Sequence, residues 1–424
     1  MTKREFIKTI SIVPLLPDGL NRLLTSAHNV PGMDVPTAEL ARDEAFWATI
    51  RQAYQIKPDY INLENGYYCI QPEPVLNSFI QHVRDVNREG SYYMRTRQFD
   101  DKAAARNRLA KVAGCSPDEL IITRNTTESI DTVIAGLTWK AGDEAIMATH
   151  DYGAMLDMFQ LQARRYGIVN KVLTIPVHPA SDDEIVSLYE QAITPKTRLL
   201  MVCHMVNITG QILPVKKITD MAHRHGVEVL VDGAHAFAHL DFAIPDLGCD
   251  YYASSLHKWL SVPIGAGLLY VKKEKIKGLW PLFADLGYAD DDIRKLNHTG
   301  THPVHTDLAI ADAIDFHEKI GIKTKESRLR HLQQYWTSQV RSLLNIRLNT
   351  PAQPERACGI ANVGVVGMAP AVLAKLLLAN HKIWTVAIDN PAASVQGVRI
   401  TPNLYTSLAE LDTFVAALQT LAKA

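Results

Sequence analysis

The sequence predicts an α/β fold in which helices cover a mainly parallel sheet, followed by a small α+β domain. Between residues 119 and 272, short runs rich in β-branched residues alternate with helical patterns, which is typical of such a covered sheet. After residue 300 the alternation stops, and long amphipathic patterns precede shorter strands. The chain has 424 residues, which is enough for two or three domains of ordinary size.

The large domain is predicted element by element. Its first strand, residues 119–124, is followed by Asn125, which caps a helix that carries Glu128 at its third position. Further strands are expected at 144–149, 171–175, 198–203, 227–231, 251–254 and 265–272, and the last could run antiparallel. Helices are expected at 153–166, 182–193 and 214–225.

The small domain is predicted to begin with two long helices, at about 305–320 and 323–344. Shorter strands follow near 359–366, 383–388 and 397–401, and a helix at roughly 407–422 closes the chain. We therefore expect a large domain at 75–300 and a small domain at 301–424, with residues 30–74 joining the small domain.

Composition and charge exclude several classes of function. With 44 Lys+Arg and 45 Asp+Glu the net charge is −1, so no general attraction to nucleic acid or anionic lipid is expected. The five cysteines include no C-x-x-C pair, and no H-E-x-x-H pattern occurs, so neither a disulfide framework nor a metal site is predicted. No run of about 18 apolar residues occurs that would span a membrane.

The first 29 residues differ from the rest. Thr2-Lys3-Arg4-Glu5-Phe6-Ile7-Lys8 resembles a twin-arginine export signal with Lys3 in place of the first arginine. A short apolar stretch follows at 9–16, and Thr25-Ser26-Ala27 is a candidate cleavage site. The alternative is an N-terminal arm of a cytoplasmic enzyme. The sequence leaves a periplasmic and a cytoplasmic location both open.

The strongest chemical signal is a carboxylate and an amine that follow nearby strands. Asp232 ends an apolar strand, and Lys258 follows the predicted strand 251–254. The carboxyl ends of parallel strands meet at one edge of a sheet, where α/β folds bind ligands. This pair is what pyridoxal 5′-phosphate (PLP) requires, because an amine forms its Schiff base and a carboxylate keeps its pyridine nitrogen protonated.

Three motifs together resemble a fold-type I PLP enzyme of aminotransferase class V. They are Asn125-Thr-Thr-Glu-Ser129, Asp232-Gly-Ala-His235 and Ser255-Leu-His-Lys258, and the resemblance spans roughly residues 60–420. Within that class the chain is most similar to the isopenicillin-N-epimerase-like group. The physical pattern agrees in one respect: Thr126 and Thr127 open a helix, whose N-terminal N–H groups favour a phosphate.

The resemblance implies a role for each site residue. Lys258 would form the internal aldimine and then serve as the base, and Asp232 would contact the pyridine nitrogen. The other implied contacts are the phosphate (Thr126, Thr127, Ser255 and His257), the cofactor face (Tyr152), the phenolic oxygen (His235), the substrate α-carboxylate (Asn207 and Arg399) and the phosphate of a neighbouring subunit (Thr301). The last implies a homodimer with a shared active site.

The resemblance defines the reacting intermediate better than its fate. The first expectation is aminotransferase- or epimerase-like chemistry at the α-carbon of an amino acid or a peptide-borne amine. Alternatives are β-elimination of a carbon–sulfur bond and a non-catalytic binding or regulatory protein. Desulfurases of this class carry a cysteine about fifteen residues before the arginine; here Trp384 lies near that place, and Cys358 is too far away. Substrate, stereochemistry and pathway are not determined by the sequence.

A second anion-binding role is open for Arg95 and Arg97. They could recognise a distal carboxylate of the substrate, or they could form ordinary surface ion pairs.

Overall fold

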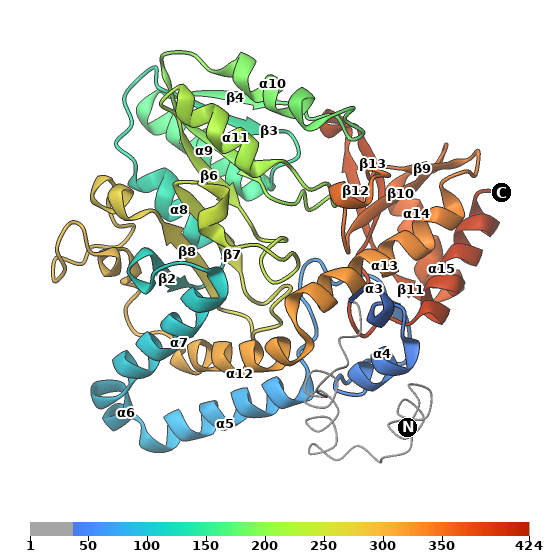
Figure 1. Cartoon of the computed structure of the whole chain (residues 1–424), viewed down its shortest axis with the longest axis horizontal. Coiled ribbons are helices and arrows are strands. Elements are labelled where there is room, and N and C mark those ends of the chain that lie inside the picture. Colours follow the sequence, from blue (N-terminus) through green and yellow to red (C-terminus); the bar gives the residue numbers. More distant parts are fainter. Residues whose placement is uncertain (1–36, 424) are drawn as a thin grey trace.

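The computed structural model describes residues 37–423, which form a large and a smaller sheet with their covering helices and a further two-stranded sheet (Figure 1). The export signal predicted in residues 1–29 lies outside the described residues. The helices are α3 (Thr37–Leu40), α4 (Glu44–Arg51), α5 (Glu73–Glu89), α6 (Ser91–Thr96), α7 (Gln98–Ala113), α8 (Thr126–Gly136), α9 (Gly153–Tyr166), α10 (Asp182–Ala192), α11 (Val215–Arg224), α12 (Val304–Ile320), α13 (Ile322–Val340), α14 (Pro370–His381) and α15 (Leu408–Leu421).

The strands belong to three sheets of seven, four and two strands. They are β1 (Ile61–Asn62), β2 (Leu120–Thr123), β3 (Glu144–Ala148), β4 (Val169–Leu173), β5 (Thr197–Cys203), β6 (Glu228–Asp232), β7 (Tyr251–Ser255), β8 (Gly267–Val271), β9 (Ile346–Leu348), β10 (Ala361–Val365), β11 (Ile383–Trp384), β12 (Val386–Asn390) and β13 (Val395–Ile400).

The large sheet has the order β2-β8-β7-β6-β5-β3-β4. Strands β4, β3, β5, β6 and β7 are mutually parallel, whereas β8 runs antiparallel to both β7 and β2. The mainly parallel sheet and the antiparallel strand at 265–272 are therefore confirmed. Because the parallel strands share a direction, β3, β5, β6 and β7 all end at the same edge.

The sheet is buried on both faces, which explains its continuous apolar strands. Successive side chains of a strand point to opposite faces. In β5, Leu199 and Met201 pack in one core cluster with residues of α8 and α9, while Leu200 and Val202 pack in another with residues of α7, α10 and α11. The helices at 153–166, 182–193 and 214–225 are confirmed, with ends that agree within one residue.

The second sheet is antiparallel, in the order β12-β13-β10-β9. Its core cluster includes residues of α13, α14 and α15, which confirms a small α+β unit. One expectation was wrong, and one helix was not predicted. The strand expected at 383–388 is divided, because β11 pairs with β1 and β12 pairs with β13. Helix α14 was missed, because its alanine- and leucine-rich sequence shows little periodicity.

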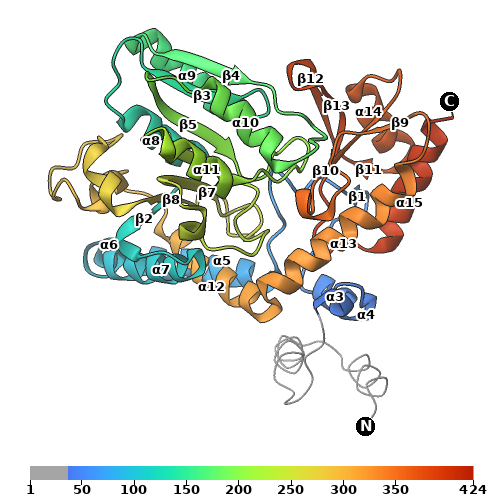
Figure 2. The ribbon, with the colours of Figure 1, turned by 45° about the horizontal axis from the view of Figure 1, so that its top comes forward.

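Helix α12 lies beside α5 and α7 along the first unit, and α13 continues toward the second (Figures 1 and 2). Gly321, with φ of 81°, separates the two helices. We propose 75–300 and 301–424 as the two domains, with residues 30–74 associated with the second. Segment 61–64 supports this association, since β1 pairs with β11 and Glu64 bridges to Thr401. None of the helices in residues 37–423 has the length and apolar character needed to cross a membrane.

Candidate active site

The site is assembled where adjacent strands of the large sheet end. Asp232 is the last residue of β6, and Lys258 follows β7, which pairs with β6 in parallel. Burial lowers the pKa of Lys258 and raises that of Asp232, and the two side chains are close enough that their mutual attraction opposes both shifts. The predicted meeting of a carboxylate and an amine at one sheet edge is therefore observed.

The amine of Lys258 has a lowered pKa. Burial is the largest influence on its pKa, and Arg399 acts in the same direction, so that the pKa falls to about 8. Its Nζ lies 3.1 Å from Nε2 of His235. A lysine whose pKa lies near 8 is partly neutral at physiological pH, and only the neutral amine is a nucleophile or a base.

Asp232 and His235 occupy a dry environment. Asp232 is 5% exposed, and its Oδ1 accepts a hydrogen bond from the backbone N–H of Ala234 at 3.0 Å. Burial raises the pKa of Asp232, and a nearby cation opposes that rise. Burial holds the pKa of His235 well below its usual range, so this imidazole is neutral. Its Nδ1 accepts the indole N–H of Trp259 at 3.4 Å.

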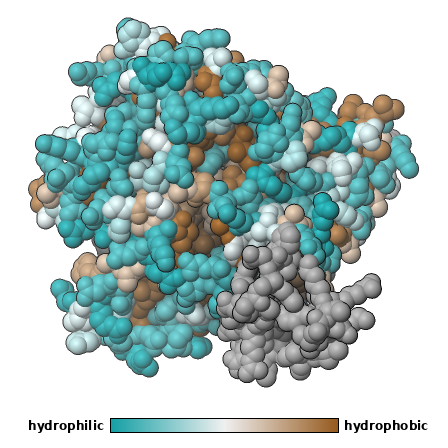
Figure 3. Space-filling view, in the orientation of Figure 1, coloured by the Kyte–Doolittle hydropathy of each residue, from teal (hydrophilic) through white to brown (hydrophobic). Residues whose placement is uncertain are grey.

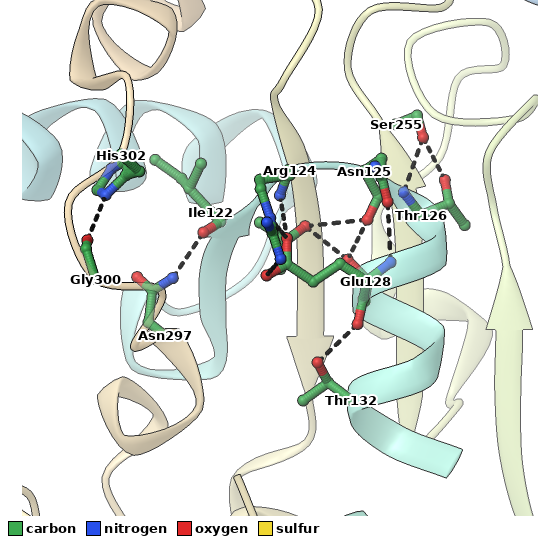
Figure 4. A network of polar contacts seen from close by, with 12 residues as sticks. Ile122, Arg124, Asn125, Thr126, Glu128, Thr132, Ser255, Asn297, Gly300 and His302 are labelled. Carbon is green, nitrogen blue, oxygen red and sulfur yellow. Dashed lines mark hydrogen bonds and ion pairs between the residues drawn. The ribbon is translucent and has the colours of Figure 1, made fainter. Parts of the chain in front are cut away.

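The start of α8 and the end of β7 form a second cluster (Figure 4). The backbone N–H of Thr126 donates to Oγ of Ser255 at 2.8 Å, and the two hydroxyl oxygens are 2.7 Å apart. Asn125 caps the helix by accepting the N–H of Glu128 at 2.9 Å, as expected. A Cβ on Gly267 would come within 2.8 Å of the Asn125 backbone, so this glycine allows α8 to approach the sheet.

His257 lies between Ser255 and Lys258 in the sequence, and its side chain faces Tyr68 of the N-terminal segment. Its ring stacks on Tyr68, with centroids 6.5 Å apart. Nδ1 of His257 is buried and has no hydrogen-bond partner in residues 37–423. Burial, followed by the charge of Lys258, lowers the pKa of His257 to about 4. A neutral histidine with an unused nitrogen is a hydrogen-bonding group available to a ligand.

Arg399 and Asn207 are brought together, although they are 192 residues apart. Nη1 of Arg399 donates to the backbone oxygen of Asn207 at 3.2 Å. Glu64 binds a second side of the guanidinium, with Nη2–Oε1 at 2.5 Å and Nε–Oε2 at 3.1 Å. Oδ1 of Asn207 is buried and has no partner in the described part of the chain. The guanidinium of Arg399 therefore already binds a carboxylate, and that carboxylate is the side chain of Glu64.

The other predicted site residues make fewer contacts with the two clusters described above. Tyr152 sits at the N-cap of α9 after β3, with 47% of its surface exposed, so its ring is free to stack on a ligand. Thr127 is half-buried on the first turn of α8. Thr301 is exposed; its segment is bonded to β2 through Asn297 and Ile122, and Thr301 itself takes no part in the hydrogen bonds between Thr126 and Ser255. Arg97 forms ion pairs with Glu89 and Asp101, which favours the surface interpretation.

The residues present fit PLP. Two hydroxyls and a helix N-terminus suit a phosphate, and a buried carboxylate suits a protonated pyridine nitrogen. A buried amine of lowered pKa suits the aldehyde. The unused nitrogen of His257 leaves a hydrogen bond open for such a ligand. No group of three or more His, Cys, Asp or Glu residues that could hold a metal ion occurs within residues 37–423.

Sequence reasoning missed Glu64, Tyr68 and Trp259. The first two lie on segment 62–71, which is held at the site by hydrogen bonds to Thr401 of the small unit and by the hydrogen bond from the Cys69 N–H to the backbone oxygen of His257. Their only signal is the polar, glycine-containing run Asn62-Leu-Glu-Asn-Gly66 after a short apolar stretch. Trp259 directly follows the lysine, but nothing in its position along the chain indicates a partner 24 residues earlier.

Comparisons with known proteins agree with this geometry. Residues 70–398 match the family "Aminotransferase class-V". The chain is 29% identical to an isopenicillin N epimerase of Amycolatopsis lactamdurans over 89% of its own length and 99% of the relative's. It is 26% identical to a probable cysteine desulfurase of Synechocystis sp., over 88% and 94% of the two chains.

Solved structures share the fold. A variant of C-DES with glycine covalently linked to its PLP cofactor superposes with a TM-score of 0.79 at 21% identity, covering 87% of this chain and 98% of that one.

Proposed function

Because the chain belongs to the aminotransferase class-V family of PLP-dependent enzymes, we propose that it acts at the α-carbon of an amino acid or a peptide-borne amine. We assign Lys258 the role of the residue that binds PLP and then serves as the base. The observation that carries this assignment is the buried Lys258 amine, of lowered pKa, beside the buried carboxylate of Asp232.

When bound, PLP supplies an electron sink for the electron pair of a bond to the α-carbon. The remaining work belongs to the protein. Asp232 would hold a proton at the pyridine nitrogen, since a buried anion favours a bound cation. Thr126, Thr127, Ser255 and His257 would fix the phosphate, while Tyr152 would cover one face of the ring. Lys258, once free, would take the α-proton at its Nζ.

Lys258 is surrounded by groups that tune this proton transfer. His235 is neutral and lies 3.1 Å from Nζ, so it can donate its Nε2–H to the free amine without adding charge. Arg399 disfavours the ammonium form by its own charge. Both effects keep the amine a competent base close to neutral pH.

A second function, elimination of a β-substituent, has its own support. C-DES, the protein of the solved structure described above, is a "cystine C-S lyase", and its complex with its product superposes with a TM-score of 0.76 at 22% identity. Cysteine desulfurases are also among the relatives. Trp384, on β11, stands near the place of the desulfurase cysteine, and Cys358 is buried, so carbon–sulfur cleavage here would not pass through a protein persulfide on that residue.

The function is tested first at Lys258. The purified protein supplied with PLP is expected to be yellow, and reduction with borohydride should leave the cofactor on the peptide that contains Lys258. Lys258→Ala should lose both the covalent label and all turnover, because Lys258 is the amine whose charge acts on Asp232 within residues 37–423. Lys325→Ala is the matched control, since Lys325 is also buried with a lowered pKa. A label on another lysine, or no colour in the wild type, would refute the assignment.

Products then distinguish the reactions in a screen of amino acids and short peptides. Exchange of the α-proton without a keto acid indicates epimerisation. A keto acid formed without ammonia indicates transamination, and pyruvate with ammonia indicates elimination.

A further inference from the structure

The carboxylate that occupies Arg399 in the candidate site is built into the chain. Glu64 meets Nε and Nη2 of the guanidinium with two oxygens, the arrangement in which arginine binds a carboxylate most strongly. Both side chains are almost completely buried, at 7% and 8% exposure. The face of Arg399 that would be expected to hold the α-carboxylate of a substrate is therefore filled.

Glu64 is held in this position by its own segment. Its Oε1 accepts the N–H of Tyr67 at 3.0 Å, and its backbone N–H donates to Oδ1 of Asn62 at 3.1 Å. The next residue, Asn65, is fixed to Thr401 by two hydrogen bonds, 2.5 and 2.7 Å long. Thr401 lies two positions after Arg399, so both partners of the ion pair belong to one connected unit.

Gly66 shows that the backbone is shaped around the guanidinium. A Cβ at this position would lie 2.9 Å from Cζ of Arg399, which is closer than real Cβ atoms approach other atoms. Segment 64–66 thus encloses Arg399 from two sides, with a carboxylate on one edge and a bare backbone against its plane. Removing Glu64 from the pair would leave a buried charge without a partner.

The donors that remain on Arg399 suit a neutral carbonyl. A guanidinium has five N–H groups; two bond to Glu64 and one bonds to the backbone oxygen of Asn207. Two are left, which is enough for one carbonyl oxygen. A substrate carboxylate would approach a pair whose charge is already balanced, and it would face the like charge of Glu64.

Asn207 carries the complementary feature. Its Oδ1 is buried and has no hydrogen-bond partner in residues 37–423. As an acceptor, this oxygen can bind the N–H of an amide but not a carboxylate. Arg399 and Asn207 together therefore offer a donor for a carbonyl oxygen and an acceptor for an amide nitrogen.

We propose that Glu64 determines the substrate class by occupying Arg399, so that the site selects amines whose neighbouring carbonyl is an amide, as in a peptide, over free α-amino acids. This inference rests on the function proposed above and decides between its two substrate classes. A peptide N-terminal residue or an amino-acid amide has the required chemistry: an amine for the α-carbon reaction, a carbonyl oxygen for Arg399 and an amide N–H for Asn207.

The test compares acids with their amides in the PLP-loaded enzyme and in Glu64→Gln. Binding of propionate and propionamide, which lack an amine and cannot react, is measured by calorimetry. Binding of alanine and alaninamide is followed by the change in the visible absorbance of the enzyme. Each ligand is measured in both proteins, so differences in amine acidity between an acid and its amide cancel. Glu326→Gln is the matched control, because Glu326 also pairs with an arginine, Arg330, but on α13.

The wild type is expected to bind the amides at least as tightly as the acids. In Glu64→Gln the affinity for the acids should rise by about tenfold or more, because the like charge is gone, while that for the amides changes less than about threefold. Glu326→Gln should leave both ratios unchanged.

Three results would overturn the inference. The first is a wild type that binds the acids at least tenfold more tightly than the amides. The second is an acid-to-amide affinity ratio that is unchanged in Glu64→Gln, and the third is weaker acid binding in that variant, which would mean that Glu64 only supports Arg399. The first needs no variant, so the test holds even if Glu64→Gln does not fold. Borohydride labelling of Lys258 reports on the proposed function separately.

Discussion

Trp259 shows how a residue next to the candidate site can determine which ring nitrogen of His235 carries the proton. Its indole N–H can only donate, and it donates to Nδ1 of His235 at 3.4 Å. The proton of this neutral imidazole is thereby placed on Nε2, the atom 3.1 Å from Nζ of Lys258. A hydrogen bond donated to a nitrogen favours its unprotonated form. Trp259 therefore helps to keep the nitrogen of Lys258 free of its proton.

Replacing Trp259 by Phe should release this constraint. Without the indole N–H, His235 can move its proton to Nδ1 and accept a hydrogen bond from Lys258 at Nε2. The pH midpoint of the visible absorbance change of the PLP-loaded enzyme should then rise, by up to about one pH unit. Trp336→Phe is the control, because Trp336 is also buried but lies on α13, in the core of the small unit. An unchanged midpoint in Trp259→Phe would contradict the role assigned to the indole.

At the scale of elements, helix α13 is hydrogen-bonded to the segment that contains Lys258. Lys325, on the first turn of α13, donates from its Nζ to the backbone oxygen of Trp259 and lies 3.3 Å from Nδ1 of His317 on α12. It lines a cavity of about 290 Å³ between α12, α13 and the loop at 237–242. Apolar side chains gather near the centre of the face in Figure 3. Lys325 forms no ion pair within residues 37–423, and burial lowers its pKa to about 7.

This lowered pKa predicts a pH dependence of stability. Between the folded pKa of about 7 and the ordinary value of 10.5, the unfolded chain holds a proton on Lys325 that the folded chain lacks. The free energy of unfolding should therefore rise with pH over this interval. Lys325→Met should be more stable than the wild type at pH 7 by an amount on the order of 1 kcal/mol or more, net of the lost hydrogen bond.

Urea unfolding at pH 7, 8 and 9 measures the effect. The slope of unfolding free energy against pH should be smaller in Lys325→Met than in the wild type. Lys258 is present in both proteins, so its own titration cancels in the difference. Lys217→Met, which changes an exposed lysine paired with Asp182, should keep the wild-type slope. Equal slopes for Lys325→Met and the wild type would contradict burial of a neutral amine.

At the scale of the whole molecule, the candidate site lies between two units. Lys258 and Asp232 come from the large sheet, whereas Arg399 comes from the small one and Glu64 from the segment joined to it. Thr301, by contrast, is exposed and does not complete the Thr126–Ser255 cluster of its own chain. We propose that it does so in a second copy, which makes the working molecule a dimer.

The dimer predicts a cofactor effect from a residue outside the site of its own chain. Sedimentation should give twice the 47.1 kDa mass of the chain. Thr301→Val should raise the dissociation constant for PLP by about tenfold, the loss of one hydrogen bond to a charged group. Thr413→Val, on the exposed face of α15, should not. A monomer that retains PLP with the wild-type affinity would refute the shared site.

Much of this protein was predictable from short stretches of sequence. The strand-ending Asp232, the lysine after the next strand and the cap at Asn125 each depend on local pattern and on the rule that parallel strands end at one edge. The large sheet and its helices follow from the same periodicity. Helix α14 escaped prediction because its apolar residues have no period, and β11 and β12 were merged because a two-residue strand carries no pattern of its own.

Only the tertiary structure decided what surrounds these groups. Glu64 and Arg399 are 335 positions apart, and Trp259 and His235 are 24 apart, so nothing in either neighbourhood specifies the partner. Burial likewise depends on the complete fold: it is what lowers the pKa of Lys258 to about 8 and of Lys325 to about 7. The sequence by itself determined the family and the cofactor chemistry, and it supplied Lys258 as the proposed reactive lysine, because each is carried by a local motif. Tertiary packing decided which carboxylate Arg399 holds, because that contact exists only once segment 61–64 is packed against β11 and β13 of the small unit.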